Sequence, residues 1–87
     1  MPMKRSDVYA RLDDEREYQA QRWPKERPHS FEEWFTYMRD YISEAEHILS
    51  RTATPEAQEP AANIMRKVTA MGIAALEQHG CPWRTPR

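Results

Sequence analysis

Residues 30–51, SFEEWFTYMRDYISEAEHILSR, decide the fold of this chain. Ser30 followed three positions later by Glu33 is the pattern of a capping box, which marks the start of a helix. The apolar residues that follow recur at the i, i+3, i+4, i+7 spacing of one helix face for about five turns. They are Phe31, Trp34, Phe35, Met38, Tyr41, Ile42, Ala45, Ile48 and Leu49. The stretch therefore predicts a long amphipathic helix over residues 30–51.

A second long helix is predicted over residues 60–79, which are apolar around most of the circumference and therefore buried. Residues 52–60, TATPEAQEP, separate the two helices, with a short turn beginning at Pro55. Gly80 and Pro82 mark the end of the second helix. Two long helices joined by a short loop form an antiparallel hairpin, and two such hairpins pair into a four-helix bundle.

The N-terminal region predicts a shorter, more polar helix over residues 6–22, with Ser6 as its N-cap. Its apolar residues are too sparse to stabilise it alone, so it must lie across the other helices or a neighbouring subunit. Residues 1–5 are expected to be a frayed terminus and residues 80–87 a tail. No stretch alternates in the pattern of a strand, so the class is all-α, with residues 1–87 forming one domain.

The composition favours an oligomer. A chain of 87 residues with 39% apolar residues forms a marginal core alone, so we expect a homo-oligomer, either a dimer or a tetramer. The net charge of −1 offers no basic excess for nucleic acid. No apolar run reaches the length of a membrane span, and the N-terminus lacks the apolar segment of a signal peptide. With the single cysteine Cys81, which excludes an internal disulfide, these features predict a cytoplasmic protein.

A polar stripe of Glu33, Asp40, Glu44 and His47 runs along the predicted helix, away from its apolar face. Asp40 and Glu44 lie four residues apart and point the same way, so they could share Mg²⁺, which prefers oxygen ligands. Glu33 and His47 would assist Asp40 and Glu44 in holding the ion. The facing helix carries basic residues at its middle, where a magnesium site needs further carboxylates. We therefore favour a solvated or salt-bridged face over a metal site.

The connector RWPKERPH, residues 22–29, joins the first two helices, and its prolines disfavour helix. In it Trp23, Lys25 and His29 combine an aromatic ring with basic side chains, an arrangement that stacks a base and contacts phosphates. With Lys67 of the last helix they are the candidate nucleotide-binding residues. The simpler alternative, which we favour for Trp23, is that its ring plugs the end of the bundle.

The order of these motifs resembles small phage and prophage proteins related to the MazG-like all-α nucleotide pyrophosphohydrolases. The resemblance covers residues 13–80 and comprises ERxxQxxRW, a short loop, HSxxEW, an acidic helix and a helix reading KVTAMGIAALEQHG. The matching residues are Glu15, Arg16, Gln19, Arg22, Trp23, His29, Ser30, Glu33, Trp34, Asp40, Glu44 and residues 68–80.

The resemblance implies dimeric or tetrameric helical bundles in which carboxylates hold Mg²⁺ and activate water to cleave a nucleoside triphosphate between its α and β phosphates. It places those carboxylates in an EExxE motif on one helix and an ExxD motif on its partner. The first motif reads DYISE here, from Asp40 to Glu44, and the second falls at residues 64–67, where both acids are missing. We hypothesise that Lys67 or Arg66 replaces the metal by pairing with Asp40 and Glu44.

The sequence thus favours a small phage-type MazG-like protein that is not catalytic and binds a nucleotide, or a host or phage protein, in the host cytoplasm. The alternative is a Mg²⁺-dependent nucleoside triphosphate pyrophosphohydrolase with Asp40 and Glu44 as metal ligands. A further alternative is a purely structural or regulatory interaction module, which needs no pocket. The sequence contains no Ser, His and Asp in the pattern of a catalytic triad, no glycine-rich phosphate loop and no CxxC motif. Nucleophilic catalysis is therefore not predicted.

Overall fold

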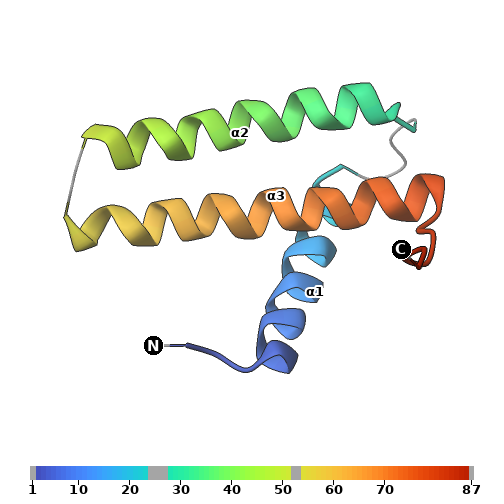
Figure 1. Cartoon of the computed structure of the whole chain (residues 1–87), viewed down its shortest axis with the longest axis horizontal. Coiled ribbons are helices and arrows are strands. Elements are labelled where there is room, and N and C mark those ends of the chain that lie inside the picture. The colour runs from blue at the N-terminus through green and yellow to red at the C-terminus, as the bar shows by residue number, and fades with distance from the viewer. Residues whose placement is uncertain (1, 24–27, 52–53, 87) are drawn as a thin grey trace.

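The computed structural model describes residues 2–23, 28–51 and 54–86, and the regular structure in these ranges is helical throughout. The elements are α1 (Arg5–Arg22), α2 (Phe31–Arg51), the 3₁₀ turn η1 (Pro55–Ala57) and α3 (Gln58–His79). In the described ranges no helix is long and apolar enough to cross a membrane. α2 and α3 lie side by side and antiparallel, and α1 crosses α3 (Figure 1). The predicted all-α class is therefore confirmed.

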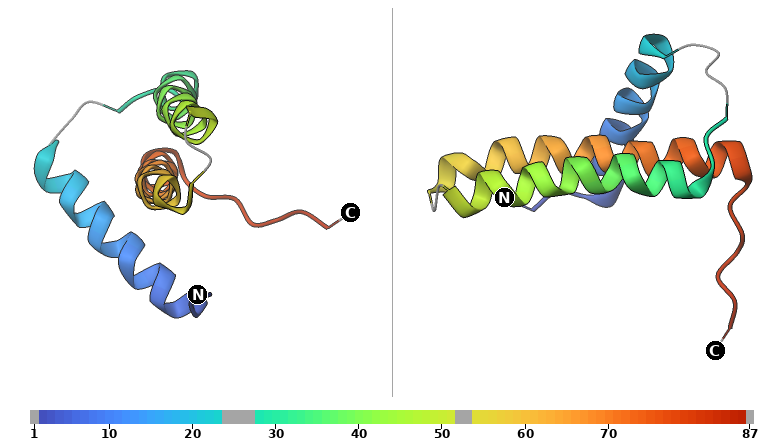
Figure 2. Two further views of the ribbon diagram at one scale, coloured as in Figure 1. Left: turned by 90° about the vertical axis from the view of Figure 1, so that its left-hand side faces the viewer. Right: turned by 90° about the horizontal axis from the view of Figure 1, so that it is seen from above.

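The end-on view of the hairpin shows how the remaining segments are placed (Figure 2). α1 lies on one side of the α2–α3 hairpin, and residues 80–86 leave it on the other side. α1 reaches α3 but leaves much of α2 uncovered, so one long face of the hairpin has no helix of this chain against it.

The start of α1 differs from the prediction. The helix begins at Arg5, one residue into the expected frayed terminus, and Lys4 rather than Ser6 occupies the N-cap position. No side chain caps this end. Instead the Lys4 carbonyl oxygen accepts hydrogen bonds from the backbone N–H groups of Asp7 and Val8, at 3.0 and 3.1 Å. The N-cap therefore lies two residues before the predicted Ser6, and the backbone bonds of Lys4 begin the helix without a side-chain cap.

The predicted capping box at the start of α2 is confirmed. The Glu33 backbone N–H donates to Ser30 Oγ at 3.1 Å, and the Ser30 backbone N–H donates to Glu33 Oε1 at 3.0 Å. These two bonds satisfy donors that the first helical turn leaves without partners.

The boundaries of α3 follow from its flanking turns. It begins at Gln58, two residues before the predicted start, because Ala57 at the end of η1 already has helical dihedral angles of −74° and −16°. At the other end Gly80 has a φ of +92° and donates its N–H to the Leu76 carbonyl oxygen at 2.7 Å. A positive φ favours glycine, so the predicted terminating role of Gly80 is confirmed.

The core is small and lies between α2 and the second half of α3. Trp34 is buried against three α3 residues, and two partly buried α2 side chains pack against them. The α3 residues are Met71, Ala74 and Ala75, and the α2 residues are Met38 and Tyr41. No large side chain in the described ranges is completely buried. This agrees with the marginal core expected from the length of the chain.

α1 is attached to α3 by buried polar groups rather than by an apolar face. Glu15 and Gln19 are the buried residues of α1. Arg66 Nε donates to Glu15 Oε1 at 2.9 Å, and Gln19 Nε2 donates to the Lys67 carbonyl oxygen at 3.2 Å. Because burial of an unpaired charge or amide is costly, these bonds specify where α1 crosses α3.

We expect Arg66→Met to reduce the free energy of unfolding by about 2 kcal/mol, because it leaves the buried Glu15 carboxylate without its cation. The measurement is urea unfolding followed by circular dichroism. Arg39→Met on the exposed surface of α2 is the matched control and should change stability by less than about 0.5 kcal/mol. Equal stability losses in the two variants would show that the ion pair does not anchor α1.

Candidate functional site

An aromatic pocket lies where the end of α1, the connector and the hairpin meet. It has a volume of about 300 Å³. It is lined by Trp23, His29, Trp34, Tyr37, Tyr41 and Met71. Trp23 and His29 precede α2, three rings come from α2, and Met71 of α3, far away in the sequence, adds a thioether to the same space.

Gln78, near the end of α3, holds the two sides of this pocket in place. Its Oε1 accepts hydrogen bonds from the His29 backbone N–H at 3.1 Å and from Trp34 Nε1–H at 3.0 Å. His79 Nε2 lies 2.6 Å from the His29 carbonyl oxygen. The backbone of His29 is thus held against the C-terminal turn of α3, and the Trp34 indole has the acceptor that a buried N–H requires.

The His29 ring stands between two aromatic rings of α2. Its centroid lies 5.3 Å from that of Trp34 and 5.3 Å from that of Tyr37, with interplanar angles of 88° and 81°. Its Nδ1 lies 3.8 Å from Glu33 Oε2. Edge-to-face contacts of this kind are favourable and set the orientation of the rings. Glu33, a candidate metal residue, is therefore engaged with Ser30 and His29 at the start of α2.

Lys67 places a cation beside the pocket. Its Nζ lies 5.8 Å from the centroid of the Tyr41 ring, within the range of a cation–π contact. In the described ranges neither Lys67 nor Arg66 forms an ion pair with Asp40 or Glu44, and Arg66 pairs with Glu15 instead. Our hypothesis that one of these cations substitutes for a metal by pairing with both carboxylates is therefore wrong for the single chain.

The remaining metal candidates lie on the outer side of α2. Asp40, Glu44 and His47 are exposed. Within the part of the chain that the structure describes, no group of three His, Cys, Asp or Glu side chains is close enough to hold a metal ion. Two carboxylates of one helix do not supply the ligand set of a magnesium-dependent hydrolase, which would need further acids from a second chain.

The nucleotide-binding candidates are brought together more closely than the metal candidates. Trp23 and His29 line the same pocket, and Lys67 contacts a third lining ring. Lys25 lies outside the described residues. Trp23 keeps 47% of its surface exposed in the single chain and forms one wall of the pocket. That its ring plugs the end of the bundle stays a prediction.

Sequence reasoning missed Trp34, Tyr37, Tyr41 and Met71 as lining residues, and Gln78 as the acceptor that fixes the pocket. A signal for the tyrosines was present, because positions 37 and 41 follow Trp34 by three and seven residues and so share its side of α2. No comparable signal identifies Gln78.

Comparison of the chain with protein-family models, with curated proteins and with solved structures found no match.

We expect Gln78→Leu to reduce the free energy of unfolding by about 1–3 kcal/mol, because two donors lose their shared acceptor while the side-chain volume is kept. Gln58→Leu, at the exposed start of the same helix, is the matched control. Urea unfolding and the tryptophan emission maximum are the measurements. The anchoring role of Gln78 is rejected if both variants unfold at the same urea concentration.

Proposed function

We propose that this chain is a MazG-like helical protein that binds a nucleotide, with the base in the aromatic pocket. The single observation that carries the proposal is the convergence of Trp23, His29, Trp34, Tyr37 and Tyr41 on one space, with the Lys67 ammonium group beside it. The resemblance to nucleotide pyrophosphohydrolases also favours nucleotide binding, and its matching residues include Trp23, His29 and Trp34 of this pocket.

The chemistry of the pocket suits a planar heteroaromatic ring. Stacking of a base on an aromatic side chain contributes about 1–3 kcal/mol, and every base presents a face for it. A volume of about 300 Å³ lies at the small end of the range for ligand sites, which fits a base and not a larger cofactor. Lys67 at the Tyr41 side supplies one cation for a phosphate group.

The proposal assigns binding and not hydrolysis to the single chain. Asp40 and Glu44 are exposed on one helix, and the two acid positions of the second motif carry Ile64 and Lys67 on α3. The pyrophosphohydrolase alternative requires a second chain to bring further carboxylates to them. Nucleotide binding that requires Mg²⁺ would indicate the pyrophosphohydrolase, whereas binding without Mg²⁺ would indicate the proposed binding function.

Thermal melting with adenosine, guanosine, cytidine, uridine and their triphosphates, each with and without Mg²⁺, tests this function. A ligand at one hundred times its Kd stabilises the fold by about 2.7 kcal/mol, which raises the Tm of so small a domain by several degrees. We expect at least one nucleoside or nucleotide to do so without Mg²⁺. Tyr37→Ala should abolish the shift, whereas Tyr18→Ala, at an exposed tyrosine of α1, should retain it.

The other outcomes are equally informative. A shift that requires both a triphosphate and Mg²⁺ supports the hydrolase, and release of pyrophosphate would then be assayed. The absence of any shift rejects nucleotide binding and leaves an interaction module whose partner is a protein.

We also propose that the chain is a homo-oligomer in which a second copy covers the open face of the hairpin. Phe31, Phe35, Met38, Ile42, Ala45 and Leu49 follow one another at alternating spacings of four and three residues, which is the spacing of a coiled-coil seam. Phe35 and Ile42 keep 59% and 45% of their surface exposed. On α3, Met65 is 67% exposed and borders an apolar groove of about 270 Å³ between the two helices.

A second copy is the occupant that these observations favour. The seam is continuous with the core of the chain, since Met38 and Ala45 also lie on the side of α2 that faces α3. Two identical hairpins related by a two-fold axis bury this face on each other and complete a four-helix bundle. A dimer, or a tetramer that contains this dimer, buries the open face of the hairpin in the same way. A host or phage protein on this face is the alternative partner.

We expect sedimentation equilibrium to show a dimer or tetramer for the natural sequence and a monomer for Ile42→Glu, because the variant buries a charge in the seam. Ser43→Glu, the next residue on the polar side of α2, is the matched control and should keep the oligomer. A monomeric natural sequence, or loss of the oligomer in both variants, contradicts the proposed seam.

A further inference from the structure

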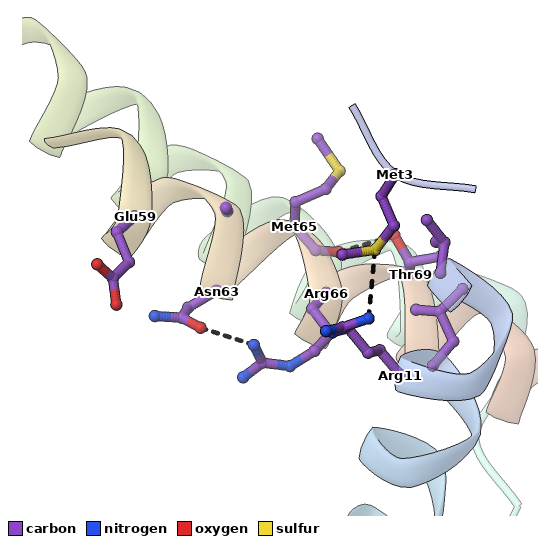
Figure 3. A pocket seen from close by; sticks show the side chains of 10 residues that line it. Met3, Arg11, Glu59, Asn63, Met65, Arg66 and Thr69 are labelled. Carbon is purple, nitrogen blue, oxygen red and sulfur yellow. Dashed lines mark hydrogen bonds between the residues drawn. The ribbon is translucent and has the colours of Figure 1, made fainter. Parts of the chain in front are cut away.

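A second groove lies between the N-terminal halves of α1 and α3 and shares no lining residue with the aromatic pocket (Figure 3). Its volume is about 360 Å³. Met3, Val8, Leu12 and Met65 supply apolar surface, and Met3, Val8 and Met65 are each at least 40% exposed. The single chain therefore leaves a second apolar concavity uncovered, on the side of α3 that α1 crosses.

Two guanidinium groups border this groove. Arg66 uses Nε for Glu15 at 2.9 Å and one Nη1–H for Asn63 at 2.6 Å. A guanidinium carries five N–H donors, so three of those of Arg66 have no acceptor among the described residues. Arg11 Nη1 has only the Met3 thioether sulfur, at 3.3 Å, and this is a weak acceptor.

The distribution of charge along the groove is uneven. Arg11 and Glu59 lie at opposite ends in the close-up view, with Arg66 between them and Met65 above (Figure 3). In the described ranges Arg11 forms no ion pair with a carboxylate, since its one hydrogen bond is to Met3. The Arg11 end is thus cationic and the walls beside it are apolar.

We propose that this groove binds an amphiphilic carboxylate, with its carboxylate between Arg11 and Arg66 and its hydrocarbon chain against Met3, Leu12 and Met65. A guanidinium binds a planar carboxylate through two parallel N–H···O bonds, and the bond is stronger beside apolar surface than in open water. The Met3 and Met65 side chains are flexible thioethers, which adapt to a hydrocarbon chain. This inference does not depend on nucleotide binding.

Titration of the full chain with sodium decanoate, below its micellar concentration, tests the proposal. With ¹³C-methyl methionine labelling, the methyl signals of Met3 and Met65 should shift in a saturable way, while that of Met38, packed between α2 and α3, should not. Decanol, which has the same chain without the charge, should bind about tenfold more weakly, as expected for the loss of a charge-assisted pair.

Variants locate the carboxylate. Arg11→Gln should weaken decanoate binding about tenfold and leave decanol binding unchanged, whereas Arg39→Gln on α2 should bind decanoate as the natural sequence does. The proposal is overturned if Arg11→Gln binds decanoate as tightly as the natural sequence, or if no saturable shift occurs. It is equally overturned if the Met3 signal responds to protein concentration alone, because the groove would then be a contact between copies. Met65 also borders the groove between α2 and α3 that the second copy is proposed to cover, so its signal is not used for this comparison.

Discussion

The packing of Trp34 against the second half of α3 is the contact on which the rest of the structure depends. The indole is buried against Met71, Ala74 and Ala75, and its N–H is satisfied by Gln78. Because Gln78 also binds the backbone of His29, one side chain of α3 fixes both the start of α2 and the connector that leads to it. The aromatic pocket exists because these bonds bring the two segments together.

α2 carries two adjacent apolar seams, and the single chain buries only one of them. The core is therefore small, and large apolar side chains of α2 remain exposed. One seam, containing Trp34 and Tyr41, faces α3 and forms the core. The other, containing Phe35 and Ile42, has no partner in this chain and remains exposed. In a four-helix bundle each helix packs against two neighbouring helices, so both seams of α2 would be buried there. The proposed oligomer and the proposed pocket therefore use adjacent sides of the same helix.

Local patterns predicted the features that depend on neighbouring residues. The reciprocal bonds of Ser30 and Glu33 and the terminating Gly80 follow from short-range sequence rules, and the structure confirms them, whereas α3 begins two residues before its predicted start. The partner of Arg66 could not be predicted in this way. It depends on where α1 crosses α3, and that crossing is set by the buried polar contacts of Glu15 and Gln19, which add nothing to the apolar pattern of α1.

The candidate site was predicted in part for the same reason. Trp23 and His29 were identified because an aromatic and basic connector is unusual in sequence, and both line the pocket. Trp34, Tyr41 and Met71 belong to apolar helix faces, so the sequence did not distinguish them from core side chains. Tyr37 lies beside that face, and only its spacing from Trp34 indicated a place in the pocket. The pocket arises from the meeting of helix ends, which is a property of tertiary structure.

The central claim is that the aromatic pocket receives a planar base. The most direct test is to record intermolecular nuclear Overhauser effects between the base protons of a bound nucleoside or nucleotide and the protein. The account predicts effects from the base to the ring protons of Trp34, Tyr37 and Tyr41. Effects confined to Met3 and Met65 in the other groove, or none at saturating ligand, would contradict it.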